Sequence, residues 1–144
     1  MVGLTSWESA LMKNSIDNTI LELKLQNFAV GNDIVFLPDF SMSFSELFKG
    51  KVYTVNEVGY CEQFDNPVLR YASTWAAKEA VYKAVKQLYD RPLSFKNIEI
   101  TRSKIAGIPH VKIPDYFSDL EISLSITHDG DYTFAIAIVK RKYD

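Results

Sequence analysis

The chain has little of what marks several common classes of protein. A single cysteine among its 144 residues, Cys61, leaves no internal disulfide possible, so we expect a reducing compartment, the cytoplasm by default. No apolar run approaches the roughly 20 residues of a membrane-spanning helix, and we expect no membrane partner. The formal net charge is −2, which gives no excess of positive charge to indicate nucleic acid as a partner.

Glycine and proline are also few, at 6 and 5 residues, and no linker rich in them divides the chain. The rest is ordinary for a globular protein, with 47% apolar and 24% charged residues. Capping boxes predict helices over 5–25 and from 54 to about 64. An Asn-Pro pair predicts a long helix from Pro67 to about Tyr89, and a short helix is expected near 43–48.

The remaining segments predict strands. Apolar or alternating residues occur at 28–37, 98–101, 110–113, 121–127 and 132–139, and Asp129-Gly130 is a strong hairpin signal. The helix over 67–89 is apolar nearly all round, which indicates a buried central helix. We therefore predict an α+β domain in which a mostly antiparallel sheet packs on a long central helix.

Two carboxylates stand out. Asp33 lies inside an apolar strand, where a carboxylate must be paired, hydrogen-bonded or bound to a cation. A strand-end aspartate that caps a turn explains the segment equally well. Glu79 shares a helical face with Ala72, Ala76 and Lys83, and the small alanines leave room for a ligand. Taken alone, Glu79 is better explained by a salt bridge to Lys83.

Three cationic or titratable residues are also candidates. Lys83 shares the face of Glu79, whereas Lys78 points about 100° away from it. Either lysine could hold a phosphate, although most lysines on helices are merely solvated. His128, at a strand end before a turn, could donate to a phosphate oxygen or be only a surface residue.

Three segments in order carry a resemblance to a known family. They are G-N-D-I-V at 31–35, W-A-A-K-E-A-V-Y-K-A at 75–84 and S-L-S-I-T-H-D at 123–129. Together they resemble holo-acyl-carrier-protein synthase, the small single-domain branch of the 4′-phosphopantetheinyl transferases. The resemblance covers about 28–140 and implies that fold for a domain over 28–144. Residues 1–27 are then an added N-terminal helical extension.

The resemblance also implies an activity and a metal site. The implied reaction is Mg²⁺-dependent transfer of the phosphopantetheine arm of coenzyme A to a serine of an apo acyl-carrier protein, with release of 3′,5′-ADP. By position, Asp33 and Glu79 match the family's two Mg²⁺ ligands, and with Lys83 they are the implied catalytic residues. A pair of carboxylates suits Mg²⁺, which also takes waters and substrate phosphates.

Other matched residues imply how coenzyme A is held. Lys78 and Lys83 match lysines near its phosphates, and Ser125 and His128 match the strand-end segment of its pocket. The family usually has an arginine and a phenylalanine where this chain has Thr74 and Trp75. Arg70, one turn earlier, is a candidate substitute for the missing arginine.

The resemblance further implies a homotrimer with active sites between subunits. In the family, the helix after the first strand is typically rich in arginine and docks an acidic carrier protein. Here 38–50 contains Asp39, Glu46 and only Lys49, so this chain departs from the usual electrostatic docking. Two alternatives stay open: a less acidic carrier domain, or docking through Lys49, Lys51 and other basic residues. Two other functions stay open: an inactive homologue that only binds carrier proteins, and a Mg²⁺-dependent phosphohydrolase that uses the same two carboxylates.

Overall fold

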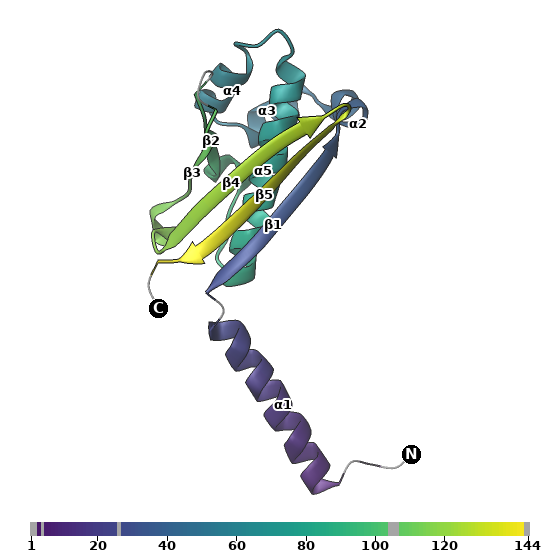
Figure 1. Ribbon diagram of the computed structural model, residues 1–144, viewed down its shortest axis with the longest axis vertical. Coiled ribbons are helices and arrows are strands. Elements are labelled where there is room, and N and C mark those ends of the chain that lie inside the picture. Colours follow the sequence, from purple (N-terminus) through teal and green to yellow (C-terminus); the bar gives the residue numbers. More distant parts are fainter. Residues whose placement is uncertain (1–2, 4, 26, 104–106, 143–144) are drawn as a thin grey trace.

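The computed structural model describes residues 3, 5–25, 27–103 and 107–142 (Figure 1). Its helices are α1 (Ser6–Leu25), α2 (Leu37–Ser43), α3 (Glu46–Val52), α4 (Val55–Cys61) and α5 (Pro67–Leu88), with short 3₁₀ turns η1 (Phe95–Asn97) and η2 (Asp115–Phe117). Its strands are β1 (Phe28–Phe36), β2 (Glu99–Thr101), β3 (His110–Lys112), β4 (Leu120–Asp129) and β5 (Tyr132–Arg141). No helix in the described part of the chain is long and apolar enough to cross a bilayer.

A three-stranded antiparallel sheet forms one layer of the domain. Its order is β1-β5-β4, and β2 pairs with β3 in a separate small sheet. Helix α5 crosses the inner face of the larger sheet (Figure 1), against the buried Ala135, Ala137 and Val139 of β5. The predicted α+β class, with an antiparallel sheet on a long central helix, is confirmed.

Local signals in the sequence explain where α5 begins and how it packs. The side chain of Asn66 accepts a hydrogen bond from the amide of Leu69 at 3.4 Å, and Pro67 occupies the first turn. Proline costs nothing there, because an amide in the first turn has no partner within the helix. Ala76, Ala80 and Ala84 are fully buried, which leaves α5 narrow enough to lie close to the strands.

The closest approach of helix and sheet is at Gly31. A Cβ at this position would lie 1.9 Å from the carbonyl oxygen of Ala80 and 2.8 Å from the amide nitrogen of Ala84. No side chain fits in that space, so only glycine allows β1 to run this close to α5. The contact sets the height of the following residues of β1 over the helix.

The segment after β1 differs from the prediction. Instead of one short helix near 43–48, the chain forms α2 and α3, separated by Phe44 and Ser45. Pro38 lies in the first turn of α2 and starts this helix directly after the strand predicted over 28–37. The hydroxyl of Ser45 accepts a hydrogen bond from the amide of Phe48 at 3.1 Å and caps α3.

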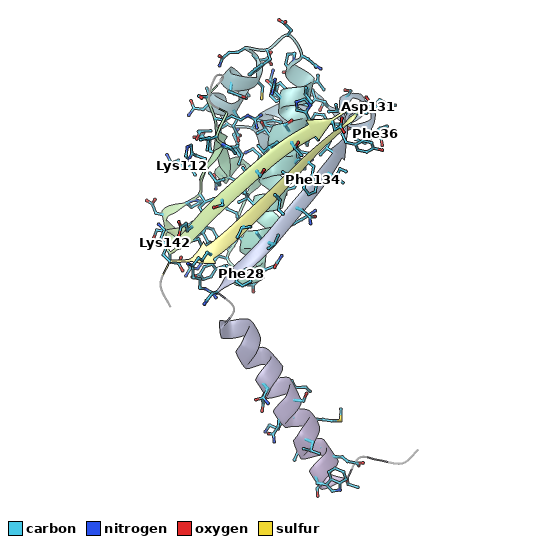
Figure 2. The ribbon with its side chains drawn as sticks, in the orientation of Figure 1. Phe28, Phe36, Lys112, Asp131, Phe134 and Lys142 are labelled. Atoms are coloured by element: carbon cyan, nitrogen blue, oxygen red, sulfur yellow. The ribbon has the colours of Figure 1, made fainter. Side chains whose placement is uncertain are left out.

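The outer side of β1 and β5 is largely apolar and exposed. Its exposed large side chains include Ile34, 62% exposed, and Phe28, 59% exposed. Figure 2 shows Phe28 and Phe36 at the two ends of β1, with Phe134 on the neighbouring strand. We call this surface the outer sheet face; its exposed members are Phe28, Val30, Ile34, Phe36, Tyr132 and Ile138. An apolar patch spread over two strands is typical of an interface.

The start of β1 and the end of β5 lie side by side. The amide of Arg141, at the end of β5, donates to the carbonyl of Asn27 at 2.8 Å, just before β1. Helix α1 projects away from this point (Figure 1), and it begins with the predicted capping box between Thr5 and Glu8. The predicted helix is thereby confirmed. The division into an extension over 1–27 and a domain over 28–144 stays a prediction.

Candidate active site

Asp33 and Glu79 meet at the β1 edge of the sheet although 46 residues separate them in the sequence. Asp33 points toward α5, because it lies on the same face of β1 as Gly31 and Val35. Glu79 is half-buried on α5, and its side chain is hydrogen-bonded to that of Asp33. We call these two residues the carboxylate pair.

The surroundings of Glu79 change its acidity. Burial, and then the hydrogen bond and negative charge of Asp33, raise the pKa of Glu79 from 4.5 to about 7, against the opposing effect of Lys83. Two carboxyl groups this close cannot both ionise easily without a cation. The pair is therefore suited to bind a cation or to exchange a proton near neutral pH.

Lys83 supplies a positive charge beside the pair. Its Nζ lies 3.1 Å from Oδ1 of Asp33 and donates to the carbonyl of Asn32 at 3.0 Å. The side chain of Lys83 is 51% exposed, so the ammonium group remains open to an anion from solvent. A lysine in this position can neutralise a phosphate that approaches the carboxylate pair.

Aromatic side chains form a wall next to Glu79 on the helix. Trp75 stacks edge-on against Phe48 of α3 and Phe95 of η1, with ring centroids 5.2 and 4.8 Å apart. Tyr82 lies 4.8 Å from Phe95 on the other side. All four rings are half-buried, so the wall holds α3 and η1 in place around the carboxylate pair.

The carboxylate pair fits the hard, oxygen-loving ion Mg²⁺. That ion takes few protein carboxylates and keeps several waters or substrate phosphates, so two partly exposed carboxylates are an adequate protein contribution. Within the described ranges, no group of three or more histidine, cysteine, aspartate or glutamate residues lies together, so the two carboxylates would be joined by waters or phosphates as ligands. Magnesium dependence stays a prediction.

Lys78 lies elsewhere than expected. Its side chain is completely buried, with Nζ 2.7 Å from Oε1 of Glu57 and donating to the carbonyls of Phe95 and Ile98. Burial lowers the pKa of Lys78, while the charge of Glu57 and its hydrogen bond work in the other direction. All three ammonium protons are thus engaged, and the expected contact with coenzyme A phosphates does not fit this position.

Glu57 is the second half of that buried ion pair. Its carboxylate also accepts from the amides of Thr54 at 2.9 Å and Ile100 at 2.8 Å. The predicted capping box at Thr54 and Glu57 is present, but the sequence signal did not reveal that the same carboxylate ties α4 to α5 and β2. Through Lys78 the ion pair holds the segment that contains Phe95, and through Glu57 it holds β2. Arg102 lies two residues after Ile100 of β2.

A second candidate site lies at the β4 edge of the sheet, in a pocket between α4, the start of α5 and residues 102–103 and 107–109. We call it the arginine pocket; its lining includes Tyr60, Phe64, Arg70, Ser73, Arg102 and His128. The guanidinium of Arg70 lies 4.1 Å from the ring centre of Phe64, and that of Arg102 lies 4.7 Å from that of Tyr60. Each of the two guanidinium groups lies over an aromatic ring. The pocket is therefore suited to an anion that also carries an aromatic ring.

Arg102 was missed by the sequence analysis. Its Nη2 donates to Oγ1 of Thr74 at 3.0 Å, so a guanidinium lies against the residue where the resemblance led us to expect an arginine. Arg70, the substitute named from the sequence, lines the same pocket. A basic residue directly after a short strand was the available signal, and it carries little weight without the fold.

Alternation along β4 separates two other predicted residues. His128 lies on the inner side with Ile126 and lines the arginine pocket. Ser125 is exposed on the opposite side of the strand, on the outer sheet face. Within one chain Ser125 cannot join the pocket, and its predicted contact with coenzyme A finds no support there.

The two sites lie on opposite sides of α5. Nine residues separate Arg70 from Glu79, which at about 100° per residue places them roughly 180° apart around the helix. Across the sheet, Asp33 is opposite Ala135, and Ala135 is opposite Ile126. Asp33 and Ile126 are thus about 10 Å apart, two strand spacings, and Arg70 and Glu79 are roughly 13.5 Å apart along the axis of α5, which lies between the two sites.

Comparison with known proteins identifies the class of this fold and site. Residues 29–137 match the family described as the 4′-phosphopantetheinyl transferase superfamily. The chain belongs to this superfamily.

Individual relatives are named as one type of enzyme within this superfamily. A holo-[acyl-carrier-protein] synthase of Wolbachia pipientis is 35% identical over 120 residues, 78% of this chain and 96% of the relative, and that of Thermodesulfovibrio yellowstonii is 36% identical over 113 residues, 76% and 96%. The solved structure of a Chronobacterium ammoniagenes ACPS–CoA complex matches with a TM-score of 0.68 and 26% identity, covering 81% of this chain and 98% of that one. The predicted resemblance, and the prediction of an enzyme of this type, are confirmed.

Proposed function

We propose that the chain transfers the 4′-phosphopantetheine arm of coenzyme A to a serine of an apo acyl-carrier protein and releases 3′,5′-ADP, with Mg²⁺ as cofactor. The observation that carries this proposal is the meeting of Asp33, Glu79 and Lys83 in the fold of a superfamily whose named activity is this transfer. Relatives named as holo-[acyl-carrier-protein] synthases support the choice of acceptor.

The carboxylate pair and Lys83 divide the chemistry between them. Mg²⁺ held by Asp33 and Glu79 would offset negative charge on the diphosphate of coenzyme A. Lys83 orients the same phosphates through its exposed ammonium group. Glu79, directly or through a water, takes the proton of the serine hydroxyl while the serine oxygen forms a bond to the β-phosphorus. The bond from that phosphorus to the bridging oxygen breaks, and 3′,5′-ADP leaves.

The arginine pocket is the proposed site of the nucleotide end of coenzyme A. Arg70 and Arg102 supply two fixed positive charges for its 3′-phosphate, and Tyr60 and Phe64 supply aromatic faces beside them. His128 adds a donor at the rim. This assignment accounts for the position of Arg102 against Thr74 in this chain.

A single chain does not present both sites to one coenzyme A molecule, because α5 stands between them. We therefore propose a homotrimer in which the carboxylate pair of one subunit faces the arginine pocket of the next. The outer sheet face is the candidate contact surface, since its exposed apolar side chains lie on the two strands beside the carboxylate pair. The cytoplasmic location stays a prediction.

The first experiment reads the intact mass of apo-carrier proteins after incubation with the chain, coenzyme A and Mg²⁺. We expect the gain of one phosphopantetheine, and its loss with EDTA, Asp33→Ala or Glu79→Ala. Release of 3′,5′-ADP without any carrier would identify a phosphohydrolase instead. Coenzyme A binding with no modified carrier would identify an inactive carrier-binding protein.

A complementation experiment tests the shared site. Glu79→Gln and Arg102→Ala are each purified, mixed in equal amounts, unfolded and refolded together. If each site draws on two subunits at random, the mixture recovers about a quarter of the wild-type turnover. Refolding the two variants separately is the control. A mixture no more active than the sum of its parts would contradict a site between subunits.

A further inference from the structure

Three residues of α5, each one helical turn after the last, contact strand β1. Glu79 is hydrogen-bonded to the side chain of Asp33. Lys83 and Gln87 each donate to a backbone carbonyl of the strand, at 3.0 and 2.8 Å. Gln87 is therefore the third member of a row whose first two members belong to the proposed active site, although neither the sequence nor the proposed chemistry gives it a role.

The carbonyls that these side chains reach lie on the open edge of the sheet. Strand β1 is at the edge, in the order β1-β5-β4, and every second carbonyl of such a strand points away from its neighbour. Lys83 bonds to the carbonyl of Asn32 and Gln87 to that of Val30. One turn of α5 is about 6 Å and two strand residues are about 6.8 Å, so the two bonds suit both repeats at once.

These two bonds fix the register of β1 on α5. The close contact at Gly31 limits how near the strand comes to the helix, but a steric stop does not oppose sliding along it. Hydrogen bonds on either side of Gly31, at Val30 and Asn32, are directional and do oppose sliding. Pairing with β5 fixes β1 within the sheet, whereas these bonds fix it against the helix. A slide of about 1 Å would take Asp33 away from Glu79, and misplacement on that scale slows catalysis.

The two bonds differ in whether they last through the reaction. The side chain of Lys83 is 51% exposed, and in the proposed function its ammonium group engages the phosphates of coenzyme A. Gln87 is neutral and does not line the arginine pocket, so its bond to the strand is free to persist. Building on the proposed function, we propose that Gln87 is a positioning residue. Its bond holds β1 in register on α5 and keeps Asp33 beside Glu79 while Lys83 is engaged with the substrate.

Two variants of Gln87 and one control test this role. Gln87→Met keeps a side chain of similar length but removes the donor, and Gln87→Lys restores a donor that can reach the same carbonyl. The matched control is Lys86→Met. It removes an exposed bond of the same kind from α5, in which Nζ donates to the carbonyl of Arg91 at 2.9 Å, at a place away from β1.

The kinetic readout is the rate at which a carrier protein gains mass. We expect Gln87→Met to lower kcat about fivefold, the change that one net hydrogen bond allows, with KM for coenzyme A unchanged. Gln87→Lys should recover most of kcat, and Lys86→Met should leave it at the wild-type value. A role in stability alone predicts that Gln87→Met and Lys86→Met act alike, and that result would overturn the inference.

Amide hydrogen exchange reports the hold on the strand without any carrier protein. Peptides that cover β1 should exchange faster in Gln87→Met than in wild type once coenzyme A and Mg²⁺ are added, because Lys83 then leaves the strand. Without these ligands the difference should be smaller. Lys86→Met should match wild type in both conditions. Equal exchange of β1 in Gln87→Met and wild type, with ligands and without, contradicts the inference.

The outcomes separate this inference from the proposed function. If no carrier gains mass with the wild-type chain, the transfer is disproved, and the role of Gln87 in it is disproved too. If Gln87→Met modifies carriers at the wild-type rate, the transfer stands and the positioning role is wrong. A lower kcat together with faster exchange of β1, both reversed in Gln87→Lys, supports the inference.

Discussion

The contact at Gly31 yields a sharp prediction about how the site is assembled. In Gly31→Ala the new methyl group would lie 1.9 Å from the carbonyl oxygen of Ala80, where a carbon needs roughly 3.4 Å or more. Both partners are backbone, and neither can rotate away. Strand β1 and helix α5 must therefore separate locally by roughly 1.5 Å to accept the methyl group.

That separation affects both stability and turnover. Overpacking of this kind costs about 1–3 kcal/mol, more than the 0.4–1 kcal/mol or so that an alanine gains by restricting the unfolded chain. Asp33 follows Gly31 by two residues on the same side of β1, so its carboxylate moves away from Glu79 by about the same amount. A displacement near 1 Å in an active site lowers turnover about 100-fold.

Two assays check this reasoning. Urea unfolding gives the change in the free energy of unfolding, and carrier mass gain gives kcat under conditions where the variant is fully folded. Gly59→Ala is the matched control, because a Cβ at Gly59 in α4 would meet nothing within 4 Å. It should raise stability by about 0.5–1 kcal/mol and leave kcat unchanged. Wild-type stability and turnover in Gly31→Ala would refute the argument.

Three further predictions concern single side chains. Lys78→Met should lower the free energy of unfolding by about 3–5 kcal/mol in urea, because it leaves the buried carboxylate of Glu57 unpaired; Glu57→Gln combined with it should recover much of the loss. In metal-free protein, Glu79 keeps its proton up to about pH 7 in the folded state but releases it near pH 4.5 in the unfolded state. The contribution of Glu79 to the free energy of unfolding is therefore lost as the pH rises from about 4.5 to about 7. Glu79→Gln should then be more stable than wild type at pH 8, with a difference that shrinks toward pH 5 in urea titrations. Arg102→Ala should raise KM for coenzyme A more than for 3′-dephospho-coenzyme A in steady-state assays, because it removes a charge proposed to bind the 3′-phosphate.

Each of these has an outcome that would contradict it. A loss below 1 kcal/mol in Lys78→Met, roughly that of an exposed pair, would mean that the buried ion pair contributes little. A stability difference between wild type and Glu79→Gln that does not vary with pH would show that the carboxylate pair does not titrate as described. Lys112→Ala, on an exposed basic residue of β3, is the control for Arg102, and equal effects of the two on KM would argue against the arginine pocket.

Much of the fold could be predicted because its signals are local. The capping boxes at Thr5 and Thr54 and the Asn-Pro start of α5 are hydrogen bonds between residues three apart, and all are present. The hairpin of β4 and β5 follows from alternation and a turn at Gly130, whose φ is 54°. Helix α2 was missed because it is only seven residues long and depends on packing of Phe40 against α3, which no local pattern encodes.

The candidate site was predictable where a residue conflicted with its surroundings. An aspartate in an apolar strand led to Asp33, and the resemblance linked it to Glu79. The role of Lys78 could not be predicted, because helical periodicity gives the direction of its side chain but not the presence of Glu57 there. Arg102 could not be assigned because its partner Thr74 lies 28 residues earlier in the chain.

The hydrogen bond between Asn27 and Arg141 has a consequence for how the domain can be rewired. Since these residues lie side by side at one end of the sheet, a short peptide could join them, and new termini could be opened at the exposed turn around Gly130. Such a circular permutant keeps every strand pairing and omits α1. The same geometry lets the domain be inserted into a host protein through one pair of neighbouring attachment points, with α2 and α3 facing away from the host (Figure 1).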